Sequence, residues 1–134
     1  MARGLEEESM ANSEGLHENE ALLRPETIDR HRAFTSLQEE LEAADWYDQR
    51  VDATEDAELA AILAHNRDEE KEHAMMLLEW LRRHDPTLDE HMRTYLFTEG
   101  PITEIEASAE GRGAEDRTTG SGSPGSLGLG GTRP

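Results

Sequence analysis

"RDEEKEHAMMLLEWL", residues 67–81, has the composition of an α-helix, but it carries two ionisable side chains where apolar ones are expected. A helix advances about 100° per residue, so Glu70 and His73 fall on the same stripe as Leu77 and Leu81. Burying an ionised carboxylate without a partner costs several kcal/mol. The segment therefore predicts a helix that packs against another element and holds a carboxylate and an imidazole against a charged partner.

The same periodicity predicts two long helices, one before this segment and one that contains it. They are expected at about 25–51 and 57–83, and Pro25 suits the first turn of the earlier helix. Between them lies the polar connector "DATED", in which Thr54 is the expected N-cap. A connector this short makes the helices antiparallel neighbours, so the sequence predicts an αα-hairpin and an all-α fold.

Each predicted helix has one mainly apolar stripe. These stripes contain Ala33, Leu37, Leu41, Ala44, Tyr47 and Val51 in the first helix, and Leu59, Ile62, Leu63, Asn66, Leu77, Trp80 and Leu81 in the second. Glu40 falls inside the first stripe, just as Glu70 and His73 fall inside the second. If the stripes pack together, the hairpin is expected to bury all three ionisable groups.

The remainder of the chain is divided by proline and glycine. Asp85-Pro86 should stop the second long helix, and Gly100-Pro101 should end a short helical piece after it. "ITEIEASAE" could form a further short helix, and from Gly111 the Gly/Ser-rich composition predicts a flexible segment. The expected organisation is a flexible acidic segment at 1–24, a helical domain at 25–108, and a linker with a terminal peptide at 109–134.

Composition limits the possible functions. At 134 residues and 34% hydrophobic content, one small domain that oligomerises is expected. The absence of cysteine excludes disulfides and thiolate metal sites, and it fits a cytoplasmic location. No apolar run is long enough to span a bilayer, and no apolar signal core suggests export. A net charge of −18 argues against nucleic acid and anionic membranes as partners, whereas it favours cations.

A metal ion would satisfy Glu40, Glu70 and His73 together. The neighbouring Arg67 and Lys71 are expected to point away from the stripe, and Glu-x-x-His places its two side chains on adjacent turns of one face. Di-iron carboxylate bundles combine two such pairs with a Glu from each of two further helices. This chain offers one copy of each part, so a two-fold dimer with a four-helix core would complete the site. Glu-x-x-His also occurs by chance in acidic helices, and a buried histidine is often only hydrogen-bonded.

Two further acidic groups lie off the stripes. Glu39, Glu42 and Trp46 share the opposite side of the first helix, and His65, Glu69 and Glu72 share a flank of the second. Each group fits two interpretations, a solvated acidic face or a weak outer binding site for Ca²⁺ or another divalent ion.

Whole phrases of the sequence resemble one known family. "EELEAADWYDQRVDA", "AILAHNRDEEKEHA", "LEWLRR" and "RTYLFTEGPIT" are similar to the encapsulated ferritins, which are ferritin-like cargo proteins of bacterial encapsulin shells. The resemblance covers about residues 27–105. It implies a helical hairpin with an extra C-terminal helix, dimers that form a four-helix bundle, and an open ring that is typically a decamer. It also implies Fe(II) oxidation by dioxygen at a di-iron centre in the dimer interface, and storage of the product by the shell.

The resemblance also assigns roles to individual residues. It makes Glu40, Glu70 and His73 the ferroxidase ligands and places Tyr47 beside that centre, although Tyr47 alone reads as a core aromatic. In the same way, it assigns Glu39, Glu42 and Trp46 to a route by which metal enters, and His65, Glu69 and Glu72 to an outer metal-binding group. "GSLGLGG", residues 125–131, resembles the peptide that docks such cargo inside the shell.

The ligand types suit iron better than structural zinc, and carboxylates favour Fe(III) over Fe(II). Three rival interpretations remain. A non-catalytic divalent-metal-binding helical oligomer would have the same ligands but would consume no oxygen. A purely structural oligomer would pair its acids with arginine or keep them protonated. A rubrerythrin-like peroxidase would usually carry both half-sites on one chain.

Overall fold

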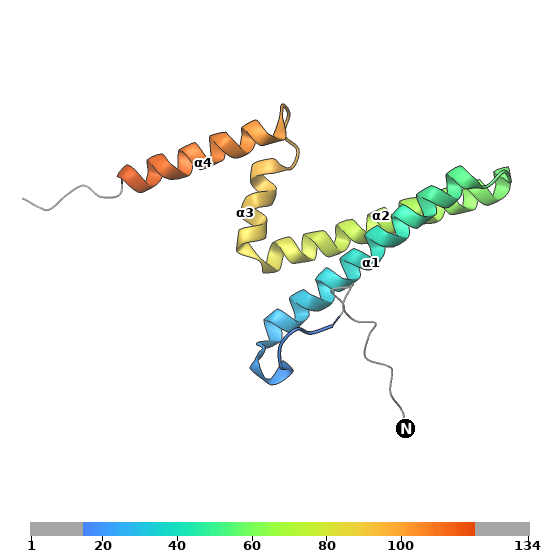
Figure 1. Cartoon of the computed structure of the whole chain (residues 1–134), viewed down its shortest axis with the longest axis horizontal. Helices are drawn as coiled ribbons and strands as arrows, with labels where there is room; N and C mark the ends of the chain where they lie inside the picture. The colour runs from blue at the N-terminus through green and yellow to red at the C-terminus, as the bar shows by residue number, and fades with distance from the viewer. Residues whose placement is uncertain (1–14, 120–134) are drawn as a thin grey trace, which may run out of the picture. The chain divides into compact units, whose positions relative to one another are not determined.

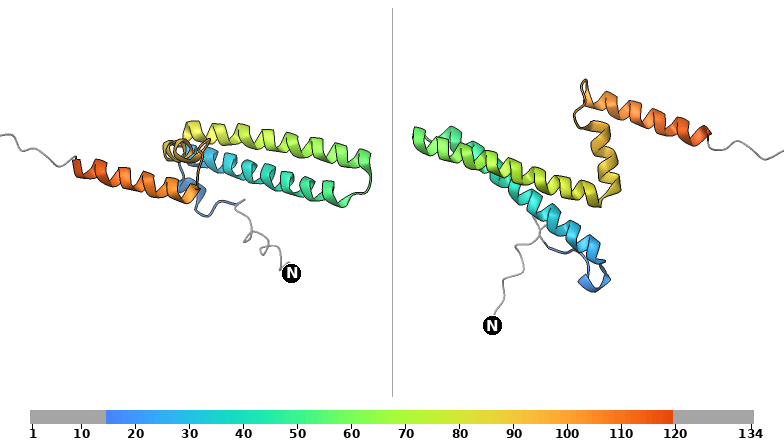
Figure 2. Two further views of the ribbon diagram at one scale, coloured as in Figure 1. Left: turned by 90° about the horizontal axis from the view of Figure 1, so that it is seen from above. Right: turned by 180° about the vertical axis from the view of Figure 1, so that it is seen from behind.

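The computed structural model describes residues 15–119, and within them it contains four α-helices, one 3₁₀ helix and no β-strand (Figure 1). The elements are η1 (Glu20–Leu22), α1 (Pro25–Ala53), α2 (Ala57–His84), α3 (Pro86–Tyr95) and α4 (Ile102–Thr119). Helices α1 and α2 pack together in antiparallel orientation; they run side by side in the left view of Figure 2 and cross each other in the right view. The predicted all-α class and the helical hairpin are therefore confirmed.

The ends of the two long helices follow ordinary helix chemistry. Pro25 begins α1, where its missing N–H costs nothing. The N-cap of α2 is Asp56, whose Oδ1 accepts a hydrogen bond from the Leu59 N–H at 2.9 Å. The prediction of Thr54 as N-cap was wrong, because Thr54 caps the end of α1 and its Oγ1 accepts from the Asp56 N–H at 3.2 Å. A carboxylate at the N-terminus of α2 also complements the helix dipole.

The described residues fall into two compact units, one ending at Asp89 and the other beginning at Glu90. Asp85 separates α2 from α3 as predicted, and its Oδ1 accepts from the Leu88 N–H at 3.0 Å. In the second unit, α4 continues to Thr119, past the position where the sequence predicted a flexible segment. Two glycines within a helix cost about 1 kcal/mol each. The run "AEDR" that follows them consists of residues that a helix tolerates, so the helix is longer than predicted.

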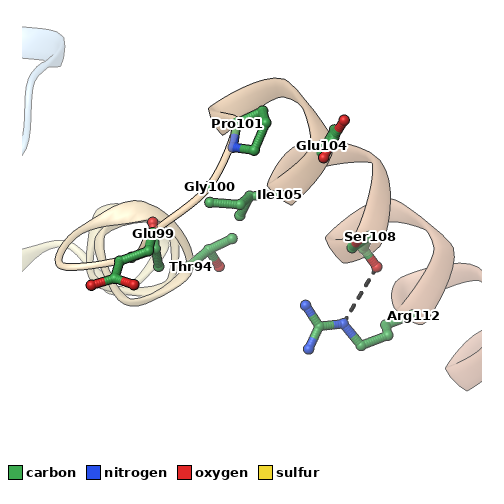
Figure 3. Close-up of a pocket in the computed structure, with 9 residues that line it drawn as sticks. Thr94, Glu99, Gly100, Pro101, Glu104, Ile105, Ser108 and Arg112 are labelled. Carbon is green, nitrogen blue, oxygen red and sulfur yellow. Dashed lines mark hydrogen bonds between the residues drawn. The ribbon is translucent and has the colours of Figure 1, made fainter.

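The connector between α3 and α4 turns through two residues with positive φ, Phe97 at 58° and Gly100 at 92°. It borders an open depression of about 420 Å³ between the end of α3 and the start of α4 (Figure 3). Two carboxylates line this depression, those of Glu99 and Glu104, and they lie on opposite sides of it. The Arg112 Nε donates a hydrogen bond to the Ser108 carbonyl oxygen at 3.3 Å. The depression therefore offers no converging carboxylates for a cation.

The apolar core of the hairpin is small. Among the described residues its buried hydrophobic members are Ala33, Ala44, Ala74 and Leu81. The stripes do not pack completely against each other as predicted, because Leu41, Leu59 and Ile62 are each about half exposed, at 50%, 45% and 52%. Two helices can cover only one side of each other. A core this small gives a single chain little stability, which supports the expectation that the chain forms an oligomer.

None of the described helices combines the length and apolarity that a membrane span requires.

Candidate metal centre

One carboxylate from α1 and a carboxylate–imidazole pair from α2 meet at the seam of the hairpin. His73 Nδ1 lies 3.5 Å from a Glu70 carboxylate oxygen and 3.7 Å from a Glu40 carboxylate oxygen. One possible ligand atom from each of these residues lies within 4.8 Å of the others. The structure therefore brings together the three residues that the sequence proposed as a metal centre.

The local sequence explains this meeting. Glu70 and His73 are three residues apart on α2, which is the spacing that places side chains on adjacent turns of one face. Glu40 occupies the matching position on α1, between the seam residues Leu37 and Ala44. The antiparallel packing of the helices then sets the three side chains at the same height along the hairpin.

The three side chains are half-buried rather than buried as predicted. Their exposed fractions are 27% for Glu40, 24% for Glu70 and 42% for His73. Within a single hairpin each seam residue is covered by one neighbouring helix only. One side of the cluster therefore remains open, where a second protein surface could close it.

No lysine or arginine forms an ion pair with Glu40 or Glu70 among the residues that the structure describes. The expectation that Arg67 points away was wrong, because its side chain is only 23% exposed and reaches across to α1. There it pairs with Asp48 at 2.9 Å and also with Asp68 at 3.1 Å, and Lys71 lies 3.8 Å from Asp68. The nearby cationic side chains are thus engaged elsewhere, and the two seam carboxylates lack a permanent counter-charge.

This donor set fits a hard or borderline cation. Two carboxylates and one imidazole are the ligand types of carboxylate-bridged iron in helical bundles. Thiolate ligands are excluded because the chain has no cysteine. Three side chains are few for one metal ion and too few for two, so one chain supplies an incomplete coordination sphere.

The predicted outer groups are placed less compactly. His65 Nε2 lies 3.6 Å from a Glu69 oxygen, whereas Glu72 joins no ion pair in the described part of the chain. Glu39, Glu42 and Trp46 are exposed on α1. Within residues 15–113, neither outer set forms a group of three converging ligands, since Glu40, Glu70 and His73 make the group that meets this criterion.

Tyr47 is a half-buried seam residue, one helical turn beyond Ala44. The guanidinium carbon of Arg50 lies 5.6 Å from the centre of its ring and 6.0 Å from that of Trp46. Both distances are within the range of cation–π interactions. This arrangement suits the core-aromatic interpretation of Tyr47, with one charged side chain bordering both rings.

Two features of the site were missed from the sequence. Ala74 is completely buried beside His73, and its small side chain allows the helices to approach closely at the cluster. Glu69 faces His73 as well as His65, since its second oxygen lies 3.8 Å from His73 Nε2. The signal for that contact was available in the four-residue spacing from His65 to Glu69 to His73.

Comparisons with known proteins agree on one family. Residues 15–99 match the family model described as EncFtn-like. An encapsulated ferritin-like protein of Rhodospirillum rubrum is 62% identical over 124 residues, which cover 89% of this chain and 88% of the relative. A ferritin-like protein of Thermotoga maritima is 57% identical over 95 residues, 71% of this chain and 83% of the relative.

A shorter match and a solved structure add to this. An encapsulin nanocompartment cargo protein of Myxococcus xanthus is 38% identical over 58 residues, which cover 43% of this chain and 45% of the relative. The crystal structure of a protein from Nitrosomonas europaea is 62% identical and superposes with a TM-score of 0.64. That likeness covers 66% of this chain and 97% of the other.

Proposed function

The chain belongs to the EncFtn-like family, and on that premise we propose that it oxidises Fe(II) with dioxygen at a di-iron centre shared by two copies of the chain. The observation that carries this proposal is the convergence of Glu40, Glu70 and His73, to which no lysine or arginine pairs in the described part of the chain. Iron is the substrate here, and these three residues would hold it.

A second copy of the chain would complete the ligand set. A two-fold axis beside the cluster would double it to four carboxylates and two imidazoles, the composition of di-iron carboxylate bundles. Leu59, Ile62 and Met76 are 45%, 52% and 59% exposed, and helical spacing puts them on the side of α2 that carries His73. Burying this apolar surface would favour the dimer and close the open side of the centre. The family resemblance extends the proposal to a decameric ring of such dimers.

The chain's own residues would favour the loss of electrons from iron. Carboxylates stabilise Fe(III) more than Fe(II), so Glu40 and Glu70 would lower the potential of the bound ion. Two Fe(II) ions at one centre would each give one electron to dioxygen. An open ring has no interior in which to store a mineral, so the oxidised iron would be retained by a surrounding shell.

The outer groups would handle iron on its way to the centre. We assign Glu39, Glu42 and Trp46 to the route by which metal enters, and His65, Glu69 and Glu72 to an outer site that could also take Ca²⁺. Glu42→Ala should slow the appearance of Fe(III) in stopped-flow absorbance without lowering the amount of iron bound at equilibrium. Loss of bound iron in this variant would contradict the role in metal entry.

The shell is proposed to be an encapsulin nanocompartment in the cytoplasm. The similarity to an encapsulated ferritin-like protein of Rhodospirillum rubrum and to an encapsulin cargo protein of Myxococcus xanthus supports the choice of shell. The terminal peptide at 125–131, which lies outside the described residues, is proposed to dock on the shell. Deleting residues 125–134 should abolish loading into co-expressed shells while oxidation by the free protein persists. Loading at the wild-type level would refute the docking role.

Anaerobic titration with Fe(II), followed by exposure to air with oxygen uptake recorded, tests the central proposal. Wild-type protein should consume oxygen, and Glu70→Gln should reduce the initial rate by at least about a hundredfold, because a ligand that acts in the oxidation step is lost. Glu55→Gln, which removes the same charge from the connector, is the matched control. Metal binding without oxygen uptake would instead identify a non-catalytic metal-binding oligomer.

A further inference from the structure

The two ring nitrogens of His73 face different carboxylates. Nδ1 faces the seam, where Glu70 and Glu40 oxygens lie at 3.5 and 3.7 Å, and Nε2 faces a Glu69 oxygen at 3.8 Å on the outer side of α2. The other oxygen of Glu69 lies 3.6 Å from His65 Nε2. Glu69 is thus the only described carboxylate that lies between two histidines, and it is not itself in the seam cluster.

We propose that Glu69 is a positioning residue that holds the Nε2–H of His73 and so reserves Nδ1 for the metal. This inference rests on the proposed function, because it treats His73 as a ligand to iron. It adds to the outer-site role proposed above, because Glu69 turns one carboxylate oxygen toward His65 and the other toward His73.

The argument follows from the chemistry of a neutral imidazole. Such a ring carries one N–H, and the hydrogen bond made by that group decides which nitrogen keeps the free lone pair. With a metal ion held by Glu40 and Glu70, an acceptor at Nε2 would favour the tautomer with its lone pair on Nδ1, the atom that points at those two carboxylates. A separation of 3.8 Å requires only a small side-chain rotation or one shared water to become a hydrogen bond.

His65 gives the Glu69 carboxylate a second contact on α2. Glu69 is about half exposed, and without a second contact its carboxylate would move freely in water. The four-residue spacing on α2 places His65, Glu69 and His73 in one row, with Glu69 in the middle. Carboxylates that orient a metal-binding histidine typically change metal affinity or activity by about 10- to 100-fold when they are removed.

The test uses Co²⁺, which binds such ligands but consumes no oxygen under these conditions. Affinity is measured by anaerobic titration of Co²⁺ absorbance, and the His73 tautomer is read from imidazole ¹⁵N chemical shifts of the metal-free protein. Glu69→Ala removes the acceptor, Glu69→Gln keeps a neutral acceptor, and Glu58→Gln removes one charge from an exposed position of the same helix that belongs to no proposed site. Circular dichroism confirms that each variant is folded.

Positioning predicts that Glu69→Ala shifts the His73 tautomer and weakens Co²⁺ binding about tenfold, the lower end of the usual range because water can replace the acceptor. Glu69→Gln should recover most of that loss, and Glu58→Gln should match wild type. Equal losses of Co²⁺ affinity in all three variants would show that the effect depends on net charge alone, and this result would overturn the proposal. Unchanged ¹⁵N shifts in Glu69→Ala would also overturn it. If wild type and His73→Ala bind Co²⁺ equally, the proposed function is refuted instead, because the metal does not bind at His73.

Discussion

Two places in the first unit set a nitrogen-bearing side chain between two carboxylates. At the corner where α2 meets α3, Arg82 donates to Glu79 and to Asp89, both at 2.7 Å. At the hairpin seam, His73 stands between Glu70 and Glu40 at 3.5 and 3.7 Å. The corner has short, direct hydrogen bonds, whereas the seam has separations that leave room for another atom.

The difference lies in where the positive charge comes from. The hydrogen bonds from Arg82 and then from Arg83 lower the pKa of Glu79 from 4.5 to about 2. In return, the bonds to Glu79 and Asp89 raise the pKa of Arg82. The corner therefore carries its own permanent positive charge, from Arg82 and Arg83. The seam has two carboxylates and an imidazole but no such cation among the described residues, so its charge balance can be completed from solution.

The largest effect is expected from a substitution that gives the seam a permanent cation, as Arg82 gives one to the corner. In His73→Arg, a guanidinium would pair with Glu40 and Glu70 as Arg82 pairs with its acids at the corner. We expect oxidation of Fe(II) to be lost, and added Co²⁺ should no longer raise Tm. The metal-free variant should be at least as stable as wild-type protein without metal.

A matched substitution at an exposed position of α2 away from the seam, Ala61→Arg, controls for the added charge on that helix. It should keep most of the oxidation activity. Retention of metal-dependent stabilisation by His73→Arg would show that the seam cluster is not where the metal binds.

The seam cluster was accessible from sequence because it depends on helical phase. Glu40, Glu70 and His73 are placed by periodicity and by a short connector, and both properties can be read from residue order. The small residues at the seam were less visible. Ala74, which is completely buried, lies seven residues before Leu81 and so shares its side of α2, but the search for large apolar residues did not single it out.

Side-chain partners across the hairpin were not predictable. Arg67 reaches Asp48 because of the detailed register of α1 against α2, which periodicity alone leaves uncertain by a residue or more. The choice of Asp56 over Thr54 as N-cap has the same origin, since both residues are good caps and the geometry of the turn selects one. The extra length of α4 shows that composition alone placed the end of that helix too early.

Metal and assembly should be coupled if the seam is half of a shared centre. Without metal, the Glu40 and Glu70 carboxylates of two chains would meet near one axis and repel each other. A ligand present at about 100 times its Kd stabilises the state that binds it by about 2.7 kcal/mol. We therefore expect Fe(II) under anaerobic conditions to shift dilute metal-free protein from monomers towards dimers and larger rings, as measured by native mass spectrometry. A chelator should reverse the shift.

Two variants separate repulsion from ligation in this prediction. Glu40→Ala removes a ligand but also removes repulsion, so its assembly should become less dependent on metal. His73→Ala removes a ligand and keeps the repulsion, so its assembly should weaken. An oligomer distribution that ignores metal, together with wild-type oxidation by His73→Ala, would end the shared-site mechanism.

The corner should affect stability and leave the chemistry unchanged. Arg82→Gln removes the guanidinium that joins Glu79 to Asp89, so these two carboxylates would lose the cation between them. We expect Tm to fall by a few degrees at neutral pH, with unchanged Fe(II) oxidation per dimer. Arg83→Gln is the matched control and should have less effect, because Arg83 is more exposed and contacts only Glu79 of the two acids. Loss of oxidation in folded Arg82→Gln would remove the distinction between the two clusters.

The smallest expected effect is a pH dependence that belongs to the corner alone. The pKa of Glu79 is 4.5 when free and about 2 in the folded chain, so below 4.5 the unfolded chain binds more protons than the folded one. The stabilising contribution of Glu79 is therefore complete above pH 4.5 and is lost as the pH falls through about 2. Arg82→Gln should lose most of this contribution, since Arg82 is the main cause of the lowered pKa.

The difference in urea midpoint between wild type and this variant should be largest near neutral pH and should shrink steadily in acid. Other carboxylates titrate in both proteins and cancel in the difference. A difference that stays constant down to pH 2 would mean that Arg82 acts by packing rather than by charge.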